Sequence, residues 1–577
     1  MADPLVSITE RLATAFAAVA GAECDPVVRP SDRADAQANG ALALAKSLGS
    51  QPREVAQKVL DAAGDISDIL ASTEIAGPGF INLVFSDEFI VSQLVEALAT
   101  PTLGVRTAPD PYTITLDYSS PNVAKEMHVG HLRSTVIGDA LTRTLSFVGY
   151  KVVRENHIGD WGTPFGMLIE HLIDLGEKEA AQELGMGDLN GFYKEARRKF
   201  EESDDFKTRA RNRVVMLQGG DEQTLHFWQT LVNESTRYFN KVYAQLGVLL
   251  TDDDLMGESA YNDMLAPVVE RLAAAGVLET SDGAEVVFAD GFTNRDNEPL
   301  PMIIRKGDGG YNYATTDLAC VIDHVERVGA KLSIYVVGAP QAQHFQMLEA
   351  VSRKAGLMPD DVRINHVAFG SVLGPDRKML KSRAGDSVKL VDLLSEAVER
   401  AEAAVAEKNP TMSPEERSEI ARMVGIGAVK YSDLASDRIK DYIFDWDRML
   451  AFEGNTAPYM QYAHARICSI FRRAEVSRQS VRTTRPILSD VHERTLALRI
   501  LRLDAAVWDM IDTLSPHKLC TYLFDLASDF TSFYEHCPVL KADTDELRQS
   551  RLVLCDATAR AMELGLSLLG IEAPEQM

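Results

Sequence analysis

The strand–loop–helix–strand pattern of residues 112–159 constrains the fold of this chain more than any other feature. Residues 112–120 (YTITLDYSS) alternate apolar and polar positions, as a half-buried strand does. Pro121 ends this strand, and apolar residues between 132 and 145 then recur at helical spacing. Residues 151–159 (KVVRENHIG) return as a second strand. This succession predicts a parallel, doubly wound α/β sheet.

The rest of the chain predicts two further domains around this sheet. Residues 1–105 combine helical patterns with a strand and predict an α+β domain, which ends in a proline-rich linker. Residues 110–388 contain the sheet and a charged helical insertion over about 165–290, and residues 389–577 predict an all-α domain. The individual segments are predicted helices at 4–20, 35–48, 52–63, 390–407, 415–434, 459–475 and 496–514, and further strands within 76–90, 332–338 and 364–374.

Net charge and cysteine usage exclude several classes of protein. The chain has 577 residues and a net charge of −26, which excludes a protein that coats nucleic acid through a cationic surface. Its six cysteines form no C-x-x-C pair, so no zinc site is expected. The sequence has no apolar run long enough for a transmembrane helix, and residues 12–24 follow acidic rather than basic residues, unlike a signal peptide. We therefore expect a soluble, cytoplasmic protein with no membrane partner.

The tetrapeptide HVGH, from His128 to His131, is the strongest local signal of chemistry. It lies between the first strand and its helix, where open α/β sheets bind ligands. Backbone N–H groups and the helix dipole favour phosphate there, and both imidazoles can donate hydrogen bonds to it. Gly130 allows a flat purine to approach bare backbone. The alternative interpretation is a helix-capping loop with two solvated histidines.

A second signal is the lysine-rich stretch RKMLKSRAG at residues 377–385. Lys378 and Lys381 flank a short loop with glycines on either side, and such a loop can close over a polyphosphate. Its ammonium groups can stabilise charge on departing pyrophosphate. Taken alone, a run of four cations is more often a solvated surface loop.

Together, these two motifs resemble those of class I aminoacyl-tRNA synthetases, in which an H-x-G-H motif is followed by K-M-x-K-S. That family has a Rossmann-type core, joins an amino acid to ATP and then transfers it to tRNA. This chain has Leu380 where the usual pattern has serine, but it keeps both lysines and Ser382. Several longer blocks resemble arginyl-tRNA synthetases in particular: residues 119–139, 156–166, 308–319, 336–346, 452–470 and 530–540.

The resemblance implies roles for individual residues. His128, His131, Lys378 and Lys381 would be catalytic. ATP would be bound by Asn122, Lys125, His128, Gly130, His131, Lys381 and Ser382. Arginine would be bound by Asp117, Ser119, Asn122, Tyr313, Asp317 and Gln341. Independently, a guanidinium requires carboxylates, and Asp317 lies one helical turn after Tyr313. Lysine would also suit these carboxylates.

For tRNA, the chain offers a run of arginines and interleaved aromatic residues near its C-terminus. Nine arginines between residues 466 and 502 face only three acidic residues. Arginine suits phosphate, and rings stack on flipped bases. An amphipathic helix pair with a solvated basic face is the alternative. The candidate tRNA-binding residues are Phe80, Asn82, Tyr459, Arg466, Arg499, Phe533 and Met577.

The resemblance thus predicts tRNA(Arg), L-arginine and ATP with Mg²⁺ as partners of a monomeric enzyme without zinc. Two rivals remain open. One is an H-x-G-H nucleotidyltransferase that adenylylates a small molecule, and the helical C-terminal region argues against it. The other is a noncatalytic tRNA-binding paralogue, and the retention of both histidines argues against that.

Overall fold

The computed structural model describes residues 3–162, 164–176, 189–294, 296–380 and 388–577. By internal contacts the chain forms two compact units. The central unit comprises Ala108–Leu450 and Leu568–Ile571. The terminal unit comprises Met1–Thr107, Ala451–Ser567 and Glu572–Met577, and so contains both ends of the chain.

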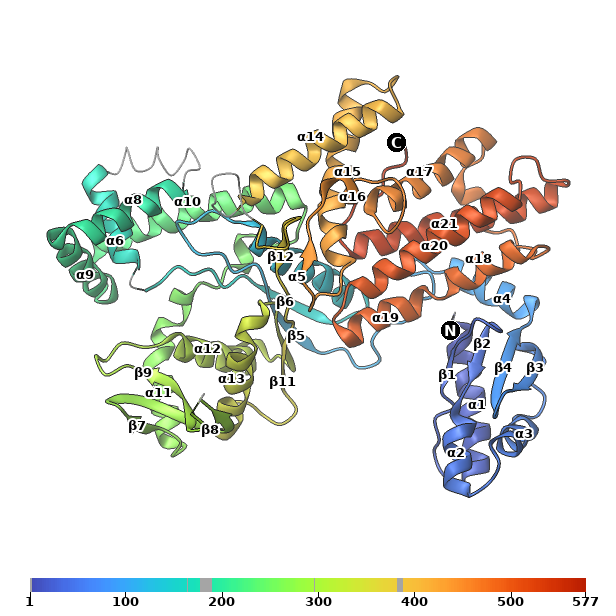
Figure 1. Ribbon diagram of the computed structural model, residues 1–577, viewed down its shortest axis with the longest axis horizontal. Coiled ribbons are helices and arrows are strands. Elements are labelled where there is room, and N and C mark those ends of the chain that lie inside the picture. Colours follow the sequence, from blue (N-terminus) through green and yellow to red (C-terminus); the bar gives the residue numbers. More distant parts are fainter. Residues whose placement is uncertain (1–2, 163, 177–188, 295, 381–387) are drawn as a thin grey trace. The chain divides into compact units, whose positions relative to one another are not determined.

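A four-stranded parallel sheet organises the central unit and confirms the predicted Rossmann-type core (Figure 1). Its strands are β5 (Thr113–Asp117), β6 (Lys151–Glu155), β10 (Leu332–Tyr335) and β11 (Arg363–His366), in the order β11-β10-β5-β6. The chain leaves β5 toward β6 on one side and later returns to β10 on the other. This reversal of direction makes the carboxyl end of β5 the topological switch point, where open α/β sheets bind their ligands.

Helix α5 (Val129–Phe147) follows β5 and packs closely on the loop that leaves the strand. The helix has buried side chains on nearly every turn, as expected for a helix that packs against a parallel sheet. Gly138 is required for this approach, because a Cβ at that position would lie 2.3 Å from the Cβ and Cγ atoms of Tyr118. Tyr118 is itself fully buried.

The insertion between β6 and β10 is helical, as predicted, but only in its first part. Its helices are α6 (Pro164–Leu175), α8 (Leu189–Glu202), α9 (Asp204–Gln218), α10 (Glu222–Leu246) and α11 (Asn262–Ala274). An antiparallel sheet of β7 (Glu279–Ser281), β8 (Ala284–Thr293) and β9 (Pro299–Arg305) then follows. The predicted helical character up to residue 290 is therefore wrong for the last dozen residues. The β-branched and aromatic run at 286–288 favours a strand there.

Two helices follow this sheet and flank β10. Helix α12 (Tyr313–Asp323) continues into a π-helical turn at His324–Val328, and α13 (Ala342–Lys354) follows β10. Their apolar faces form one hydrophobic core with α11, β8 and β9. This packing fixes the first turn of α12, where the predicted arginine-binding residues lie.

The central unit extends beyond the predicted boundary at residue 389. Helices α14 (Leu390–Lys408) and α15 (Pro414–Leu434), the parallel pair β12 (Val372–Leu373) and β13 (Tyr442–Ile443), and α16 (Trp446–Met449) all belong to it. A buried ion pair joins α5 to α15: Arg133 Nε lies 3.2 Å from Asp433 Oδ2, and both side chains are almost without exposed surface. The helix that carries HVGH is thereby fixed at a second point.

The N-terminal part of the terminal unit is the predicted α+β fold. Its antiparallel sheet has the order β1-β2-β4-β3, with strands β1 (Val28–Pro30), β2 (Ala36–Ala38), β3 (Leu70–Ala76) and β4 (Phe80–Phe85). Its helices are α1 (Pro4–Ala20), α2 (Gly40–Leu48), α3 (Pro52–Ala63) and α4 (Asp87–Leu98). The predicted helix at 35–48 is wrong in its first residues, because 36–38 pair with β4 as strand β2.

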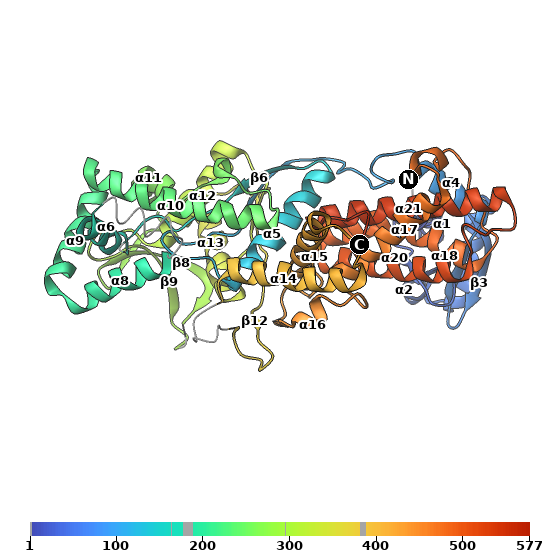
Figure 2. The same cartoon turned by 90° about the horizontal axis from the view of Figure 1, so that it is seen from above.

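The remaining part of the terminal unit is all-α. Its helices are α17 (Ala457–Ala474), α18 (Val491–Leu501), α19 (Leu503–Thr513), α20 (His517–His536) and α21 (Asp545–Leu568). Figure 2 shows α17, α18 and α20 running alongside one another, and α20 contacts both of the others. The predicted helix at 496–514 is divided between α18 and α19 at Arg502. No helix among the described residues is long and apolar enough to cross a membrane.

Candidate active site

The HVGH motif forms the first turn of α5, at the switch point of the sheet. His128 is the N-cap residue, and its Nδ1 accepts a hydrogen bond of 3.0 Å from the backbone N–H of Gly130. The Nδ1 of His131 accepts one of 3.0 Å from the backbone N–H of His128. Because both Nδ1 atoms accept, a neutral ring must carry its proton on Nε2. Both histidines therefore present Nε2–H donors.

The electrostatic surroundings keep these imidazoles neutral. Burial and the neighbouring His128 lower the pKa of His131 to about 3, and the two ring centroids are 4.0 Å apart. Partial burial and the cation of Lys125 lower the pKa of His128. The pair can therefore donate hydrogen bonds to an anion at neutral pH without a change of protonation.

The loop between β5 and α5 has an unusual backbone. Ser119, Ser120 and Ala124 have φ values of 76°, 49° and 57°, in the left-handed region that non-glycine residues seldom adopt. Such strain persists where surrounding contacts impose it, often at functional sites. Here the amide of Ser119 donates to Ser134 Oγ at 2.8 Å, and Asn156 Oδ1 accepts from the amide of Ser120 at 3.0 Å.

Asn122 lies on this strained loop beside Gly159. The backbones of the two residues pair, and a Cβ at position 159 would lie 2.5 Å from Asn122 Oδ1. Glycine at 159 is thus required for the asparagine side chain to occupy this place. Asn122 is exposed and precedes the HVGH turn, so its amide is available to a ligand on that side.

A cavity of about 430 Å³ lies at the carboxyl ends of β5 and β10. Three carboxylates line it, on Asp117, Glu258 and Asp317. Its other lining residues include Ser120, His157, Tyr261, Tyr313, Gln341, His344 and Phe345. Three acids and no lysine or arginine among the lining residues make this a site for a cation, and the two flanking tyrosine rings suit a planar one.

Asp317 and Tyr313 lie together on α12, as predicted. Asp317 Oδ2 is 2.6 Å from His344 Nε2, and the ring of Tyr313 lies 5.0 Å from the same histidine. Tyr313 is 61% exposed, so its ring borders the mouth of the cavity rather than its floor. Gln341 lines the same cavity from the turn before α13. The cavity thus brings together three predicted arginine-binding residues from two segments.

Of the two residues predicted at the other side of the cavity, Asp117 lines it and Ser119 does not. Asp117 accepts a hydrogen bond of 2.9 Å from Ser120 Oγ, and burial raises its pKa. Ser119 is buried, and its hydroxyl is engaged by Tyr243 at 2.8 Å and by Thr135 at 3.0 Å. Ser120, not Ser119, lines the cavity. Ser120 is therefore better placed than Ser119 for the predicted contact with arginine.

Glu258 is the cavity residue that sequence reasoning missed. It begins a short 3₁₀ turn, Glu258–Tyr261, and its amide donates to the carbonyl of Ile158. Desolvation and the nearby charges of Asp160 and Asp317 raise its pKa to about 7, although the residue itself is exposed to solvent. A carboxylate shifted in this way signals a site that favours a cation. The stretch around Glu258 contains no motif that would have indicated this.

The lysine loop is anchored on both sides of the part that lies outside the described residues. On the N-terminal side, the amide of Gly374 donates to the carbonyl of Lys378 at 2.8 Å. The amide of Leu380 donates to the carbonyl of Val372 at 3.2 Å. On the exit side, the amide of Val129 donates to the carbonyl of Val388 at 3.2 Å. The loop thus begins beside β12 and ends directly against the HVGH turn. Lys378 is exposed, whereas Lys381 and Ser382 lie outside the described residues.

Lys125 lies close to the HVGH turn. Its Nζ is 4.6 Å from the ring centroid of Tyr193, a cation–π contact. Glu126 next to it forms an ion pair of 2.9 Å with Lys389, just after the lysine loop. Cationic side chains thus lie on both sides of His128.

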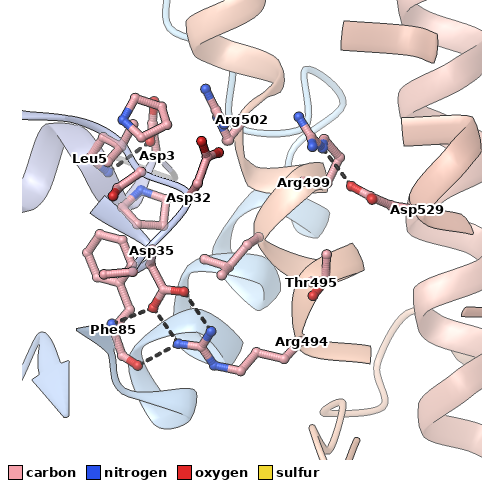
Figure 3. Close-up of a pocket in the computed structure, with 15 residues that line it drawn as sticks. Asp3, Leu5, Asp32, Asp35, Phe85, Arg494, Thr495, Arg499, Arg502 and Asp529 are labelled. Carbon is pink, nitrogen blue, oxygen red and sulfur yellow. Dashed lines mark hydrogen bonds and ion pairs between the residues drawn. The ribbon is translucent and has the colours of Figure 1, made fainter. Parts of the chain in front are cut away.

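The predicted arginine track of the terminal unit is mostly paired with acids. Arg478, Arg482, Arg485, Arg494 and Arg499 all form ion pairs within the unit. In the pocket of about 310 Å³ in Figure 3, Arg494 reaches Asp35 and the carbonyl of Phe85, and Arg499 turns to Asp529. Aspartates balance the cations of that pocket. The track is therefore less cationic than its sequence indicates.

The other predicted tRNA-binding residues differ in what they can offer a ligand. Phe533 is fully buried in the bundle, so it has no ring surface for stacking. Asn82 is 6% exposed and accepts from Gln37 at 2.7 Å, which occupies its amide oxygen. Tyr459 and Phe80 are half-buried, and Met577 ends a tail whose Glu572 and Pro574 carbonyls accept from α17.

Arg466 is the strongest remaining candidate in the terminal unit. Its guanidinium lies 5.2 Å from the ring centroid of Tyr462 and 5.2 Å from that of Tyr534. A guanidinium held between two tyrosines presents a flat, charged, aromatic surface. Bases and phosphates both bind to surfaces of this kind.

Three family models together match most of the chain. The model "tRNA synthetases class I (R), catalytic domain" matches residues 93–446. "DALR anticodon binding domain" matches residues 460–577, and "Arginyl tRNA synthetase N terminal domain" matches residues 6–85. The limit at 446 lies close to Leu450, where the main segment of the central unit ends.

Curated relatives and solved structures give the same result over the full length. The arginine–tRNA ligase of Thermobifida fusca is 53% identical over 581 residues, with both chains covered completely. That of Shigella dysenteriae is 50% identical, with 97% of each chain covered. The crystal structure of Plasmodium falciparum arginyl-tRNA synthetase has a TM-score of 0.86 at 28% identity, covering 99% of each chain. Thermus thermophilus arginyl-tRNA synthetase has a TM-score of 0.82 at 25% identity, covering 99% of this chain. The chain therefore belongs to the arginyl-tRNA synthetases, a family of class I aminoacyl-tRNA synthetases.

Proposed function

We propose that this chain is an arginine–tRNA ligase, which activates L-arginine with ATP and transfers it to the terminal adenosine of tRNA(Arg). One observation carries the proposal beyond family membership. A cavity lined by three carboxylates lies at the same sheet edge as an HVGH turn with two Nε2–H donors. A cation site and an anion site are thus adjacent, as the joining of arginine to ATP requires.

The cavity accounts for arginine recognition by charge and shape. The carboxylates of Asp317 and Glu258 would accept the guanidinium N–H groups, while the ring of Tyr313 covers its flat face. Gln341 adds a neutral amide at the rim. At the opposite end, Asp117 would hold the α-ammonium group, with Ser120 and Asn122 on the side of the α-carboxylate. This direction points the carboxylate toward the HVGH turn.

The HVGH turn accounts for ATP binding. The Nε2–H groups of His128 and His131 and the N-terminus of α5 would face the phosphates. Gly130 leaves room there, because a Cβ would lie 2.8 Å from the ring of His128. Lys125 adds a cation beside the turn. Mg²⁺ would accompany ATP, bound mainly by phosphate oxygens and water.

The first step is an in-line displacement at phosphorus. An oxygen of the arginine carboxylate attacks the α-phosphorus, and the bond to the bridging oxygen breaks to release pyrophosphate. His128 and His131 would stabilise the charge that builds up on the α-phosphate oxygens. Lys378 and Lys381, the latter outside the described residues, would stabilise the departing pyrophosphate. The anchoring of the loop beside the HVGH turn supports this division of roles.

In the second step the 2′-hydroxyl of the terminal adenosine attacks the arginyl carbonyl carbon. The ester bond forms, AMP leaves with the electrons of the acyl–phosphate bond, and the hydroxyl proton passes to the departing AMP. The adenylate is already activated, so no protein nucleophile is needed. For tRNA we retain Arg466, Tyr459, Phe80 and Met577, because their side chains keep exposed surface. We further propose that the enzyme is a cytoplasmic monomer.

Arginine-dependent exchange of pyrophosphate into ATP, with and without total tRNA, tests the proposal. We expect exchange only with tRNA, since the resemblance implies that bound tRNA completes the first step. Exchange without tRNA would support the activation of arginine by ATP but would contradict its dependence on bound tRNA. No exchange in either case, combined with tight tRNA binding, would favour the noncatalytic paralogue. Adenylylation of another small molecule without tRNA would favour the nucleotidyltransferase.

The raised pKa of Glu258 gives this enzyme a specific pH dependence. The guanidinium binds the ionised carboxylate, so protonation competes with arginine. As the pH falls below about 7, the KM for arginine should rise, approaching tenfold per pH unit, while above it KM should level off. Glu258→Gln should have a higher KM at pH 8 and a flat profile. The same slope in both proteins would contradict the assignment of Glu258.

A further inference from the structure

Four side chains of three types converge at the arginine cavity in the central unit, and two of them, His157 and Cys320, are among the residues that line it. They belong to Glu155, His157, Cys320 and His324, and one ligand atom from each lies within 4.8 Å of all the others. His324 Nε2 is 2.6 Å from Glu155 Oε2 and 3.2 Å from Cys320 Sγ. His157 Nε2 is 3.2 Å from the same Glu155 oxygen and 3.8 Å from Cys320 Sγ.

The fold positions these four groups from two rigid segments. Glu155 is the last residue of β6, and His157 follows two positions later on the same side of the extended chain. Cys320 and His324 are one helical turn apart at the end of α12. The sequence signature is therefore E-x-H together with C-x-x-x-H. No C-x-x-C pair is involved, which is why the sequence alone does not predict zinc.

The outer nitrogen, Nδ1, of each histidine faces a side-chain oxygen atom, and Nε2 points to the cluster. His324 Nδ1 lies 3.0 Å from both Ser333 Oγ and Thr115 Oγ1. His157 Nδ1 faces Asp117 Oδ2 at 3.6 Å. A hydroxyl or carboxylate behind the ligating imidazole is the usual outer shell of a metal-bound histidine, because it fixes the ring and its tautomer.

Charge balance also suits a divalent cation. Imidazoles bind a metal as neutral donors, whereas a cysteine thiolate and a glutamate carboxylate each bring one negative charge. One divalent cation would therefore balance the charge of these four ligands.

One oxygen of the Glu155 carboxylate can still accept a hydrogen bond or bind a metal. The residue is 1% exposed, and its Oε1 has no hydrogen-bond partner among the described residues. A buried carboxylate oxygen without a partner is costly, and metal ligation would relieve that cost. Cys320 and His324 are each 1% exposed, so the cluster is closed to bulk water on most sides.

We propose that Glu155, His157, Cys320 and His324 bind one Zn²⁺ in a tetrahedral, structural site. Two imidazoles, a thiolate and a carboxylate are the donors that zinc prefers, and closed four-ligand sites are structural. Zinc bonds of roughly 2.0–2.3 Å require ligand atoms about 3.3–3.8 Å apart. Three of the four observed distances lie within or next to that range, and the Glu155–His324 contact must open slightly.

The bound ion would act on the arginine site through His157. It would fix the imidazole whose Nδ1 faces Asp117, the residue proposed to hold the α-ammonium group. His157 is therefore a positioning residue in this proposal. The zinc site does not depend on the proposed ligase activity, because metal binding and pyrophosphate exchange are measured separately.

Metal content and Co²⁺ spectroscopy on the full-length protein test the site. The protein is purified without a histidine tag or chelator, and zinc per chain is measured by mass spectrometry. Metal-free protein is then titrated with Co²⁺, which reports thiolate ligation by near-ultraviolet charge transfer and tetrahedral geometry by strong visible bands. We expect about one zinc per chain and both Co²⁺ signals in the wild type.

Matched variants identify the ligands. Cys320→Ser should abolish the charge-transfer band, and His324→Gln should weaken zinc binding by at least about tenfold. Cys555→Ser, another buried cysteine in the terminal unit, should behave like the wild type. Wild-type protein that shows neither stoichiometric zinc nor a Co²⁺–thiolate band would overturn the site and leave a protonated hydrogen-bond cluster. Unchanged binding in both ligand variants would place the metal elsewhere and overturn it too.

Discussion

Replacing Asp317 by alanine should lower kcat/KM for arginine about 30- to 4,000-fold. Asp317 is the carboxylate on α12 that faces the cavity and lies 2.6 Å from His344. Its loss would leave a bound guanidinium short of its main counter-charge, and removing one partner of such a pair typically costs about 2–5 kcal/mol. At 1.4 kcal/mol per tenfold, this cost gives the stated range.

The effect should be confined to arginine. Pyrophosphate exchange measured against arginine concentration should show the loss, while the KM for ATP and the affinity for tRNA should stay within about twofold. Glu326→Ala is the matched control, since Glu326 lies in the π-helical turn after α12 and forms an exposed ion pair with Arg271. Near-normal use of arginine by the Asp317 variant would refute the pocket assignment.

Replacing His131 by alanine should reduce kcat for adenylate formation about 10²- to 10³-fold. The proposed role of its Nε2–H group is to stabilise charge that exists only in the transition state, and deleting one such donor typically has this effect. The KM for arginine should change little, because His131 does not line the arginine cavity. Single-turnover formation of arginyl-adenylate in the presence of tRNA measures the step directly.

The matched control and the pH profile separate catalysis from folding. His226→Ala removes an exposed histidine from α10 and should leave the rate unchanged. Because the pKa of His131 is lowered to about 3, the wild-type kcat should show no titration of this residue near pH 6.5. A loss of less than about fivefold in the His131 variant would remove the residue from the catalytic set.

Much of the fold is predictable from local patterns in the sequence. The helices at 4–20 and 52–63 have the predicted ends, because prolines at their starts and glycines after them mark the boundaries. Residues 36–38 escape prediction as strand β2, since the short segment Ala-Gln-Ala lacks a strand pattern and pairs with β1 and β4 only in the folded chain. The sheet β7–β9 is also not predicted, because its strands follow a long run of helices and the predicted helical segment extends into them.

The site is predictable where its chemistry is local in sequence, and it is not predictable elsewhere. HVGH is contiguous, and Tyr313 and Asp317 share one helical face, so the sequence reveals both groups. Glu258 comes from an isolated 3₁₀ turn, and only the fold brings it to the cavity. Spacing in the sequence also cannot distinguish an exposed ring from a buried one. For this reason the sequence does not reveal that Phe533, a predicted tRNA-binding residue, is buried.

The contact between Gly138 and Tyr118 limits how this sequence can evolve. Any side chain at position 138 collides with the tyrosine, so the glycine cannot change first. If Tyr118 first changes to alanine, the cavity left behind lowers the free energy of unfolding by about 3–5 kcal/mol. This is a large part of the total stability of a typical domain. Drift at either position alone is thus blocked, and descendants of this sequence should keep glycine at 138 for as long as residue 118 stays aromatic.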